Sequence, residues 1–156
     1  MKNFVLVLFC IMYQTTFSQE LNVEKYRKDI RIIDDKFTGE KRLLSPLLEP
    51  ISFMKVISPK DTLYFISLRT VASTYSTGNG VIILLENGDK ITKNVETESK
   101  LKNSQWEHSA MDYLSIEEME LLKKYNITDV RIYIHDFSVS NPEKYRAYIT
   151  LMETMK

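Results

Sequence analysis

The apolar run Val81-Ile-Ile-Leu-Leu85 constrains the fold of this chain more than any other stretch. Five consecutive apolar residues are too few to cross a membrane and too apolar for a surface strand. The run therefore predicts a β-strand that is covered on both faces. Asn87-Gly88 follows it and favours a type I′ turn, in which both central residues have positive φ. Residues 89–95 are then expected to return as the second strand of a hairpin.

The rest of the pattern predicts an α+β domain with a mainly antiparallel sheet of about six to eight strands, followed by two helices late in the chain. Ser115-Ile-Glu-Glu118 is a capping box, so a helix is expected at about 115–125, ending near Asn126. Asn141-Pro142 predicts the start of a second helix at about 142–155. Further strands are expected at 29–34, 41–44, 51–57, 62–72, 105–114 and 128–135.

Three of these segments carry more detailed expectations. Within 51–57 the apolar alternation slips by one residue, which suggests a β-bulge. Residues 96–104 are polar without an apolar period and are expected to form a surface loop. In 128–135 the alternation predicts that Val130, Ile132 and Ile134 point inward, and that Arg131, Tyr133 and His135 point outward.

The N-terminal residues have the form of a secretory signal peptide. Lys2 supplies the positive region, residues 4–13 the apolar region, and cleavage is expected after Ser18. The chain then divides into a signal peptide, 1–18, and one domain, 19–156. The alternatives are an uncleaved membrane anchor and a lipoprotein modified at Cys10, although the run is short for a membrane span. The domain would be periplasmic or extracellular, with no stable membrane span after removal of the signal.

The charge and cysteine content exclude several kinds of function. Lys and Arg number 21 and so do Asp and Glu, so the chain lacks the basic footprint of a nucleic-acid-binding protein. Cys10 is the single cysteine of the sequence. After signal removal the domain would have no disulfide, no cysteine nucleophile and no cysteine metal ligand.

Several segments carry a resemblance. The stretch Asp34-Asp-Lys-Phe-Thr-Gly39, the apolar strands after it, and the later stretches Leu114-Ser-Ile-Glu-Glu-Met119 and Ile127-Thr-Asp-Val-Arg-Ile-Tyr-Ile134 resemble small exported proteins of unknown function. Such proteins occur in Gram-negative bacteria of the gliding and gut-commensal kind. The resemblance spans most of the expected domain and implies export. It implies no catalytic residue.

The residues that could carry chemistry form no catalytic or metal-binding motif, and no cofactor is expected. The histidines His108 and His135 lie on expected strands among polar neighbours, where an outward-pointing side chain is ordinary. If their strands were adjacent, a two-histidine site would be conceivable, which leaves a small hydrolase or isomerase as an alternative. Ser73 and Ser76 lie in an expected loop, without the sharp turn that positions a serine nucleophile.

These exclusions favour a non-catalytic envelope protein that acts as a binding or interaction module, with a partner that the sequence does not identify. Arg69, Tyr133 and His135 are the predicted interaction face, on the side of the sheet that the helices leave open. Four amphipathic aromatic residues are candidates for either of two roles, to line a binding face or to pack over the sheet. They are Tyr75, Trp106, Tyr113 and Tyr133.

Two further expectations concern the exported protein. One is an alternative function, a periplasmic immunity or inhibitor protein. The other is a modification, because Asp61-Thr62-Leu63 is similar to an O-glycosylation pattern of exported bacterial proteins. The pattern falls at an expected turn and predicts a glycan on Thr62.

Overall fold

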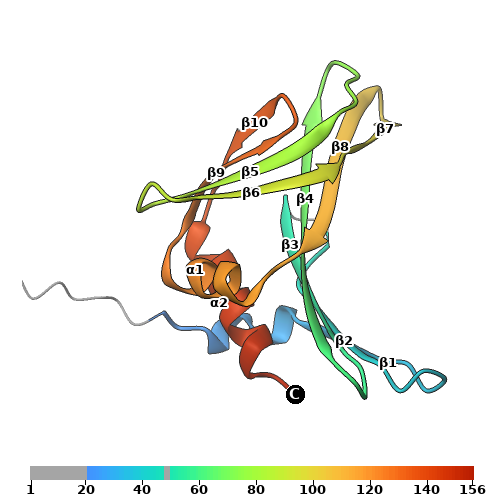
Figure 1. The fold of residues 1–156 in the computed structure, drawn as a ribbon, viewed down its shortest axis with the longest axis vertical. Coiled ribbons are helices and arrows are strands. Elements are labelled where there is room, and N and C mark those ends of the chain that lie inside the picture. The colour runs from blue at the N-terminus through green and yellow to red at the C-terminus, as the bar shows by residue number, and fades with distance from the viewer. Residues whose placement is uncertain (1–20, 48–49) are drawn as a thin grey trace, which may run out of the picture.

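The computed structural model describes residues 21–47 and 50–156, and these form two antiparallel sheets and two α-helices (Figure 1). The α+β class, the antiparallel strands and both late helices are confirmed. The predicted signal peptide, its anchor alternative and Cys10 lie outside the described residues. Strands β1 to β10 divide into a six-stranded sheet, in the order β1-β2-β3-β4-β8-β7, and a four-stranded sheet, in the order β10-β9-β5-β6. No helix in the described ranges is long and apolar enough to cross a membrane.

Along the chain, short strands come first and both α-helices come late. The elements are the 3₁₀ helix η1 Glu24–Asp29, then β1 Arg31–Asp34, β2 Lys41–Leu44, β3 Ile51–Ile57, β4 Thr62–Ala72, β5 Asn79–Leu85, β6 Lys90–Glu96, β7 Glu98–Lys102, β8 Gln105–Tyr113, α1 Ile116–Lys124, β9 Ile127–Ile132, β10 His135–Ser138 and α2 Pro142–Thr154.

The two sheets cross at a steep angle, and both helices lie in the space between them (Figure 1). The chain passes from one sheet to the other in the loop 73–78, at Thr97 between β6 and β7, and again through α1 between β8 and β9. Helix α2 buries Tyr148, Leu151 and Met152 against the inner faces of the sheets. The outer faces of both sheets are therefore left without a covering helix.

The β5–β6 hairpin is confirmed, but two details of its prediction are wrong. Strand β5 is buried on one face only, because Val81, Ile83 and Leu85 point into the core while Ile82 and Leu84 are half-exposed. The turn is not type I′, because Gly88 has a positive φ of 89° and Asn87 does not. The Gly88 amide instead donates to the Leu85 carbonyl, which closes a turn around residues 86 and 87.

The bulge predicted in 51–57 is also wrong. Strand β3 pairs with β4 in unbroken register from Ile51 opposite Leu68 to Ile57 opposite Thr62. The apolar alternation slips in the sequence only because Lys55 points inward while Met54 and Val56 point outward. The register shifts of the structure lie in β5 instead.

The loop predicted at 96–104 is a strand, β7, at the edge of the six-stranded sheet. Asn103 and Ser104 both have positive φ, at 51° and 64°, and form the tight turn into β8. Strand β7 carries Lys100 and Lys102 on the outward-facing side. Charged residues of this kind are usual on edge strands, because they discourage pairing with another chain.

The single strand predicted at 128–135 is a hairpin. Strand β9 ends at Ile132, Tyr133 and Ile134 form the turn, and β10 starts with His135. Tyr133 has a positive φ of 56°. Ile134 is 62% exposed, so its predicted inward orientation is wrong. His135 pairs with Ile132 and shares its inward-facing side, so its predicted outward orientation is wrong too.

Helix α1 begins as the sequence predicts. The Ser115 hydroxyl accepts from the Glu118 amide at 3.2 Å, and the Glu118 carboxylate accepts from the Ser115 amide at 2.8 Å. The helix ends at Lys124, close to its predicted end near Asn126. Asn126 does not have the left-handed conformation that is common at helix ends, and Tyr125 after the helix is extended with φ −121°.

We expect Ser115→Ala to lower the free energy of unfolding by about 1 kcal/mol, because the Glu118 amide at the start of α1 loses the hydroxyl that accepts from it. The matched control is Ser140→Ala, since Ser140 is exposed and outside the helices. Urea unfolding followed by circular dichroism measures both. An equal, near-zero change in both variants would contradict the role of the capping box.

Candidate functional site

The outer face of the six-stranded sheet carries a set of apolar side chains that no helix covers. We call it the outer apolar face. Strand register places one row of these residues across four adjacent strands, and further apolar positions flank that row. Its members are Leu44, which is buried, and Met54, Val56, Leu63, Phe65, Met111 and Tyr113, which are half-buried or exposed.

The row that crosses the sheet is continuous. Leu44 lies opposite Met54, Met54 opposite Phe65, and Phe65 opposite Tyr113. The rings of Phe65 and Tyr113 lie 4.7 Å apart between centroids. Met111 is 55% exposed and Tyr113 is 57% exposed. Several large apolar side chains grouped on one exposed face are typical of an interaction surface in a soluble domain.

Charged residues flank this face, and their net charge is positive. Arg69 and Lys102 both approach the single carboxylate of Glu107, at 3.6 and 3.7 Å. This group of three therefore keeps one positive charge. At the opposite side of the sheet, Arg31 points outward from β1 and has no hydrogen bond or ion pair with a described residue. A partner with acidic residues around its contact surface would complement both sides.

The three residues of the predicted interaction face do not share one surface. Arg69 lies on the outward-facing side of β4, next to the outer apolar face. Tyr133 lies in the β9–β10 turn, and His135 points inward from β10 in the other sheet.

The aromatic residues considered from the sequence are also divided between surfaces. Tyr113 lies on the outer apolar face. Tyr75 and Trp106 contact each other beside the loop 73–78, with ring centroids 4.7 Å apart. Phe65 and Met111 were not predicted as site residues, although the alternation in 105–114 already separates Met111 from the core positions.

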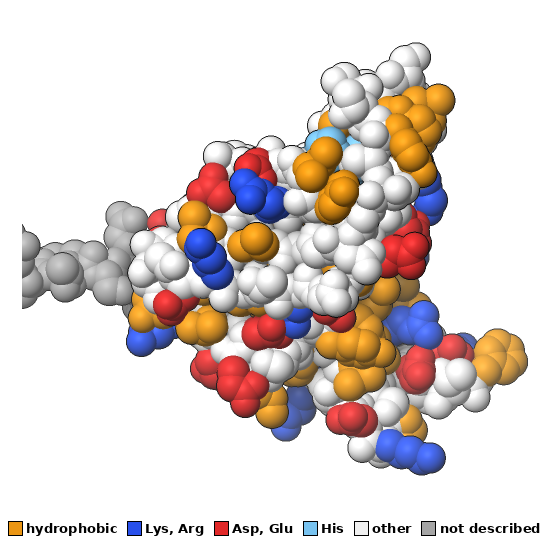
Figure 2. Space-filling view, turned by 45° about the horizontal axis from the view of Figure 1, so that its top comes forward, with side chains coloured by type: hydrophobic (Ala, Val, Ile, Leu, Met, Phe, Trp, Pro, Cys, Tyr) orange, Lys and Arg blue, Asp and Glu red, His pale blue; other side chains and the backbone are white. Residues whose placement is uncertain are grey.

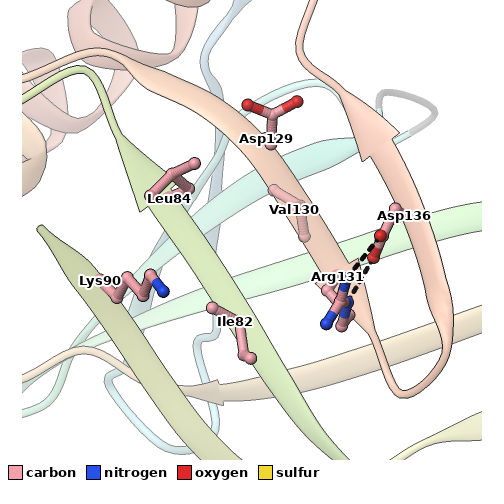
Figure 3. A pocket seen from close by; sticks show the side chains of 7 residues that line it. All are labelled: Ile82, Leu84, Lys90, Asp129, Val130, Arg131 and Asp136. Atoms are coloured by element: carbon pink, nitrogen blue, oxygen red, sulfur yellow. Dashed lines mark hydrogen bonds and ion pairs between the residues drawn. The ribbon is translucent and has the colours of Figure 1, made fainter. Parts of the chain in front are cut away.

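A second open surface is a hollow of about 280 Å³ on the outer face of the four-stranded sheet (Figure 3). Its floor is formed by Ile82 and Leu84 of β5, and Lys90 borders it on one side. On the other side Arg131 donates to both carboxylate oxygens of Asp136. The charged groups that line the hollow balance, with Lys90 and Arg131 opposed by Asp129 and Asp136. The view in Figure 2 likewise shows Lys, Arg, Asp and Glu side chains scattered among hydrophobic groups.

The two histidines come together where the sheets meet. The rings of His108 from β8 and His135 from β10 are stacked, with centroids 4.1 Å apart. His108 is 1% exposed, so its predicted outward orientation is wrong. Its Nε2 donates to the Thr74 carbonyl at 3.0 Å and its Nδ1 lies 2.7 Å from the Ser99 hydroxyl. The Ser76 hydroxyl lies 2.6 Å from Nε2 of His135.

This cluster lacks the features of a catalytic or metal site. The Ser76–His135 contact has no carboxylate behind it, because Asp136 is paired with Arg131. Both ring nitrogens of His108 are occupied within the protein, so they face no substrate. Within the described ranges, no group of three His, Cys, Asp or Glu side chains could hold a metal ion.

The position of His135 makes the stability of the protein depend on pH. Burial lowers the pKa of His135 below its ordinary value of 6.5, and positive charge on His108 lowers it further, while Asp136 acts in the opposite direction. The unfolded chain therefore binds this proton at a higher pH than the folded chain does. The contribution of His135 to stability is complete above pH 6.5 and is lost as the pH falls.

We therefore expect the free energy of unfolding to decrease from about pH 7 to about pH 5, and to decrease less in His135→Phe, which keeps an aromatic ring but cannot take a proton. Urea titrations at the two pH values measure this difference. An equal decrease in both proteins would contradict the assignment.

Thr62, the predicted glycosylation site, is the exposed first residue of β4.

No family model matches this chain, and no curated protein or solved structure matches it. Its own surfaces are therefore the guide to its function.

Proposed function

We propose that the protein is an exported, non-catalytic binding module of the cell envelope that holds a protein partner on its outer apolar face. The observation that supports this proposal most is the row Met54, Phe65 and Tyr113, with the 55% exposed Met111 beside it. Leaving such side chains in water costs roughly 25 cal/mol per Å² of apolar surface, and a partner that covers them recovers that free energy.

The charges at its sides support a partner of a particular kind. The Arg69, Lys102 and Glu107 group and the unpaired Arg31 leave positive charge on both sides of the apolar row. A partner with an apolar centre and an acidic rim fits this arrangement. A second copy of the chain fits it less well, because its own rim would bring the same positive charges.

The histidine alternative has less support. A hydrolase or isomerase needs a general base that can reach a substrate, whereas His108 is buried and His135 is bonded to Ser76. The immunity or inhibitor alternative is compatible with the same face, since its partner would be a toxin or an enzyme. A toxin gene next to the gene for this chain would favour that form of the proposal.

The test places a photo-activatable cross-linking residue at position 113 of the protein in the cells that make it. We expect a covalent adduct with another protein. Met111→Glu should lower its yield about tenfold, because a carboxylate would be buried in the apolar contact. Ile116→Glu is the matched control, since Ile116 is 78% exposed in α1, and it should leave the yield unchanged.

Two results would contradict the proposal. One is an equal yield from Met111→Glu and Ile116→Glu. The other is cross-linking of the purified chain to itself through position 113, because the occupant would then be a second copy. Export is tested on the same material by N-terminal sequencing and mass, with Gln19 expected as the first residue. A mass above that of residues 19–156 that Thr62→Ala removes would support a glycan on Thr62.

A further inference from the structure

The loop 73–78, which leads from the six-stranded sheet to the four-stranded sheet, is held by side chains from both sheets. His108 donates to the Thr74 carbonyl, and the Ser99 hydroxyl donates to the Ser76 carbonyl at 2.5 Å. The Ser76 hydroxyl bonds His135 of β10. These contacts make the loop the place where the histidine pair joins the two sheets.

The hydrogen bonds around His108 specify where protons must be. The Thr74 carbonyl can only accept, so Nε2 of His108 must carry a proton. The Ser99 hydroxyl has one hydrogen, which it gives to the Ser76 carbonyl, another pure acceptor. The Ser99 oxygen also lies 2.7 Å from Nδ1 of His108, so Ser99 links the Ser76 carbonyl to the His108 ring.

His135 has the opposite requirement. The Ser76 hydroxyl has no other bond to a described group, so it is free to donate to Nε2 of His135, which is satisfied by a neutral ring. Positive charge on both rings would be unfavourable, because their centroids lie 4.1 Å apart.

Other ionisable groups nearby face away from the pair. Those on the surrounding strands of the six-stranded sheet occupy outward-facing positions, and they are Arg69, Glu98, Lys100, Lys102 and Glu107. On β9 and β10, Arg131 and Asp136 bond each other on the outer face. Asp112 and Lys93 point inward, but Asp112 lies four residues along β8, and Lys93 is bonded to Glu118. Tyr75 lies in the loop itself, and Tyr133 packs against Gly78.

We infer that the stacked histidines form a proton-controlled latch, which holds the loop 73–78 while His135 is neutral and accepts from Ser76, and releases it when His135 takes a proton. Release would loosen the β9–β10 turn as well, because the Tyr133 ring lies so close to Gly78 that a Cβ there would overlap it. A protein with this latch changes the surface at the junction of its two sheets when its surroundings become acidic.

The first test is a pH titration of the ring ¹⁵N resonances in the wild-type protein. On acidification, both nitrogens of His135 should move from the split pattern of a neutral ring to the positions of a charged ring, over the same pH range in which the loop is released. Protonation of His135 without any change in the loop would overturn the inference. This measurement needs no variant, so it does not depend on a variant folding.

The second test follows the loop. Trp106 is the single tryptophan, and its ring lies 4.7 Å from that of Tyr75 in the loop, so its fluorescence reports release. When His135 is protonated we expect a fluorescence transition and a fall of several-fold in hydrogen-exchange protection of amides 74–78, the change that loss of one hydrogen bond supplies.

Variants distinguish release of the loop 73–78 from general unfolding of the protein in acid. His135→Phe should abolish the fluorescence transition and keep the loop protected. Ser109→Ala, on the outward-facing side of β8, should behave like the wild type. A transition that persists unchanged in His135→Phe would overturn the inference.

Discussion

Replacing Lys55 with methionine is expected to lower the free energy of unfolding by about 3 kcal/mol. Lys55 is 5% exposed, and its ammonium group donates to three carbonyls at the end of α2, those of Met152, Glu153 and Met155, at 2.8, 3.3 and 2.7 Å. The last carbonyls of a helix have no partner within it, and a positive charge is favourable there. Methionine has similar length, so the loss would reflect the hydrogen bonds rather than a cavity.

The matched control for this substitution is Lys60→Met, because Lys60 is exposed in the turn between β3 and β4. A surface change of this kind is expected to stay within about 0.5 kcal/mol of the wild type. Equilibrium unfolding in urea measures both variants. If Lys55→Met were as stable as Lys60→Met, the contact between β3 and α2 would not hold the helix in place.

Replacing Ile83 with alanine is expected to cost about 3 kcal/mol, whereas the same change at Ile82 should cost about 1 kcal/mol or less. Ile83 is fully buried at the centre of β5, between β6 and β9. Truncating it removes apolar contacts and leaves a cavity. Ile82 is the adjacent residue of the same strand, but it points to the open hollow of the four-stranded sheet.

This pair of variants distinguishes the two descriptions of the run Val81 to Leu85. Similar losses of about 2 kcal/mol or more at both positions would mean that β5 is covered on both faces, as the sequence suggests, and that the outer hollow is filled in solution. Thermal and urea unfolding of the two variants under the same conditions provide the comparison.

Local signals predicted much of the fold. The capping box at Ser115 and the pair Asn141-Pro142 act within one helical turn, so the starts of both helices could be located from the sequence. The hairpin of β5 and β6 also follows from neighbouring residues. The run 81–85 was harder, because a continuous apolar stretch does not reveal whether alternate residues are covered. Ile82 and Leu84 are apolar and still face outward.

Other features depend on contacts between distant residues. Strand β7 resembles a loop in sequence because an edge strand carries polar and charged residues such as Lys100 and Lys102. Tyr133 adopts positive φ within an alternating segment that has neither Gly nor Asn, and Gly78, 55 residues earlier, leaves room for its ring. Nothing local to residues 128–135 marks that turn.

The candidate site also depends partly on local signals and partly on contacts between distant residues. Met111 and Tyr113 could be separated from the core by their alternation. Their alignment with Phe65, Met54 and Leu44 depends on the order β2-β3-β4-β8, which the sequence does not contain. The histidine pair depends on how the two sheets meet. The predicted face of Arg69, Tyr133 and His135 assumed a single sheet, whereas these residues belong to two.

The central claim is that the outer apolar face is covered by a partner in the envelope. Methionine oxidation followed by mass spectrometry tests it, with the purified protein compared with the protein in intact cells. Met111 is 55% exposed on this face, and the half-buried Met155 near the end of α2 is the internal control. We predict that Met111 is oxidised at least several-fold more slowly in cells than in the purified protein, while Met155 reacts equally in both. Equal oxidation of Met111 in the two samples would contradict the claim.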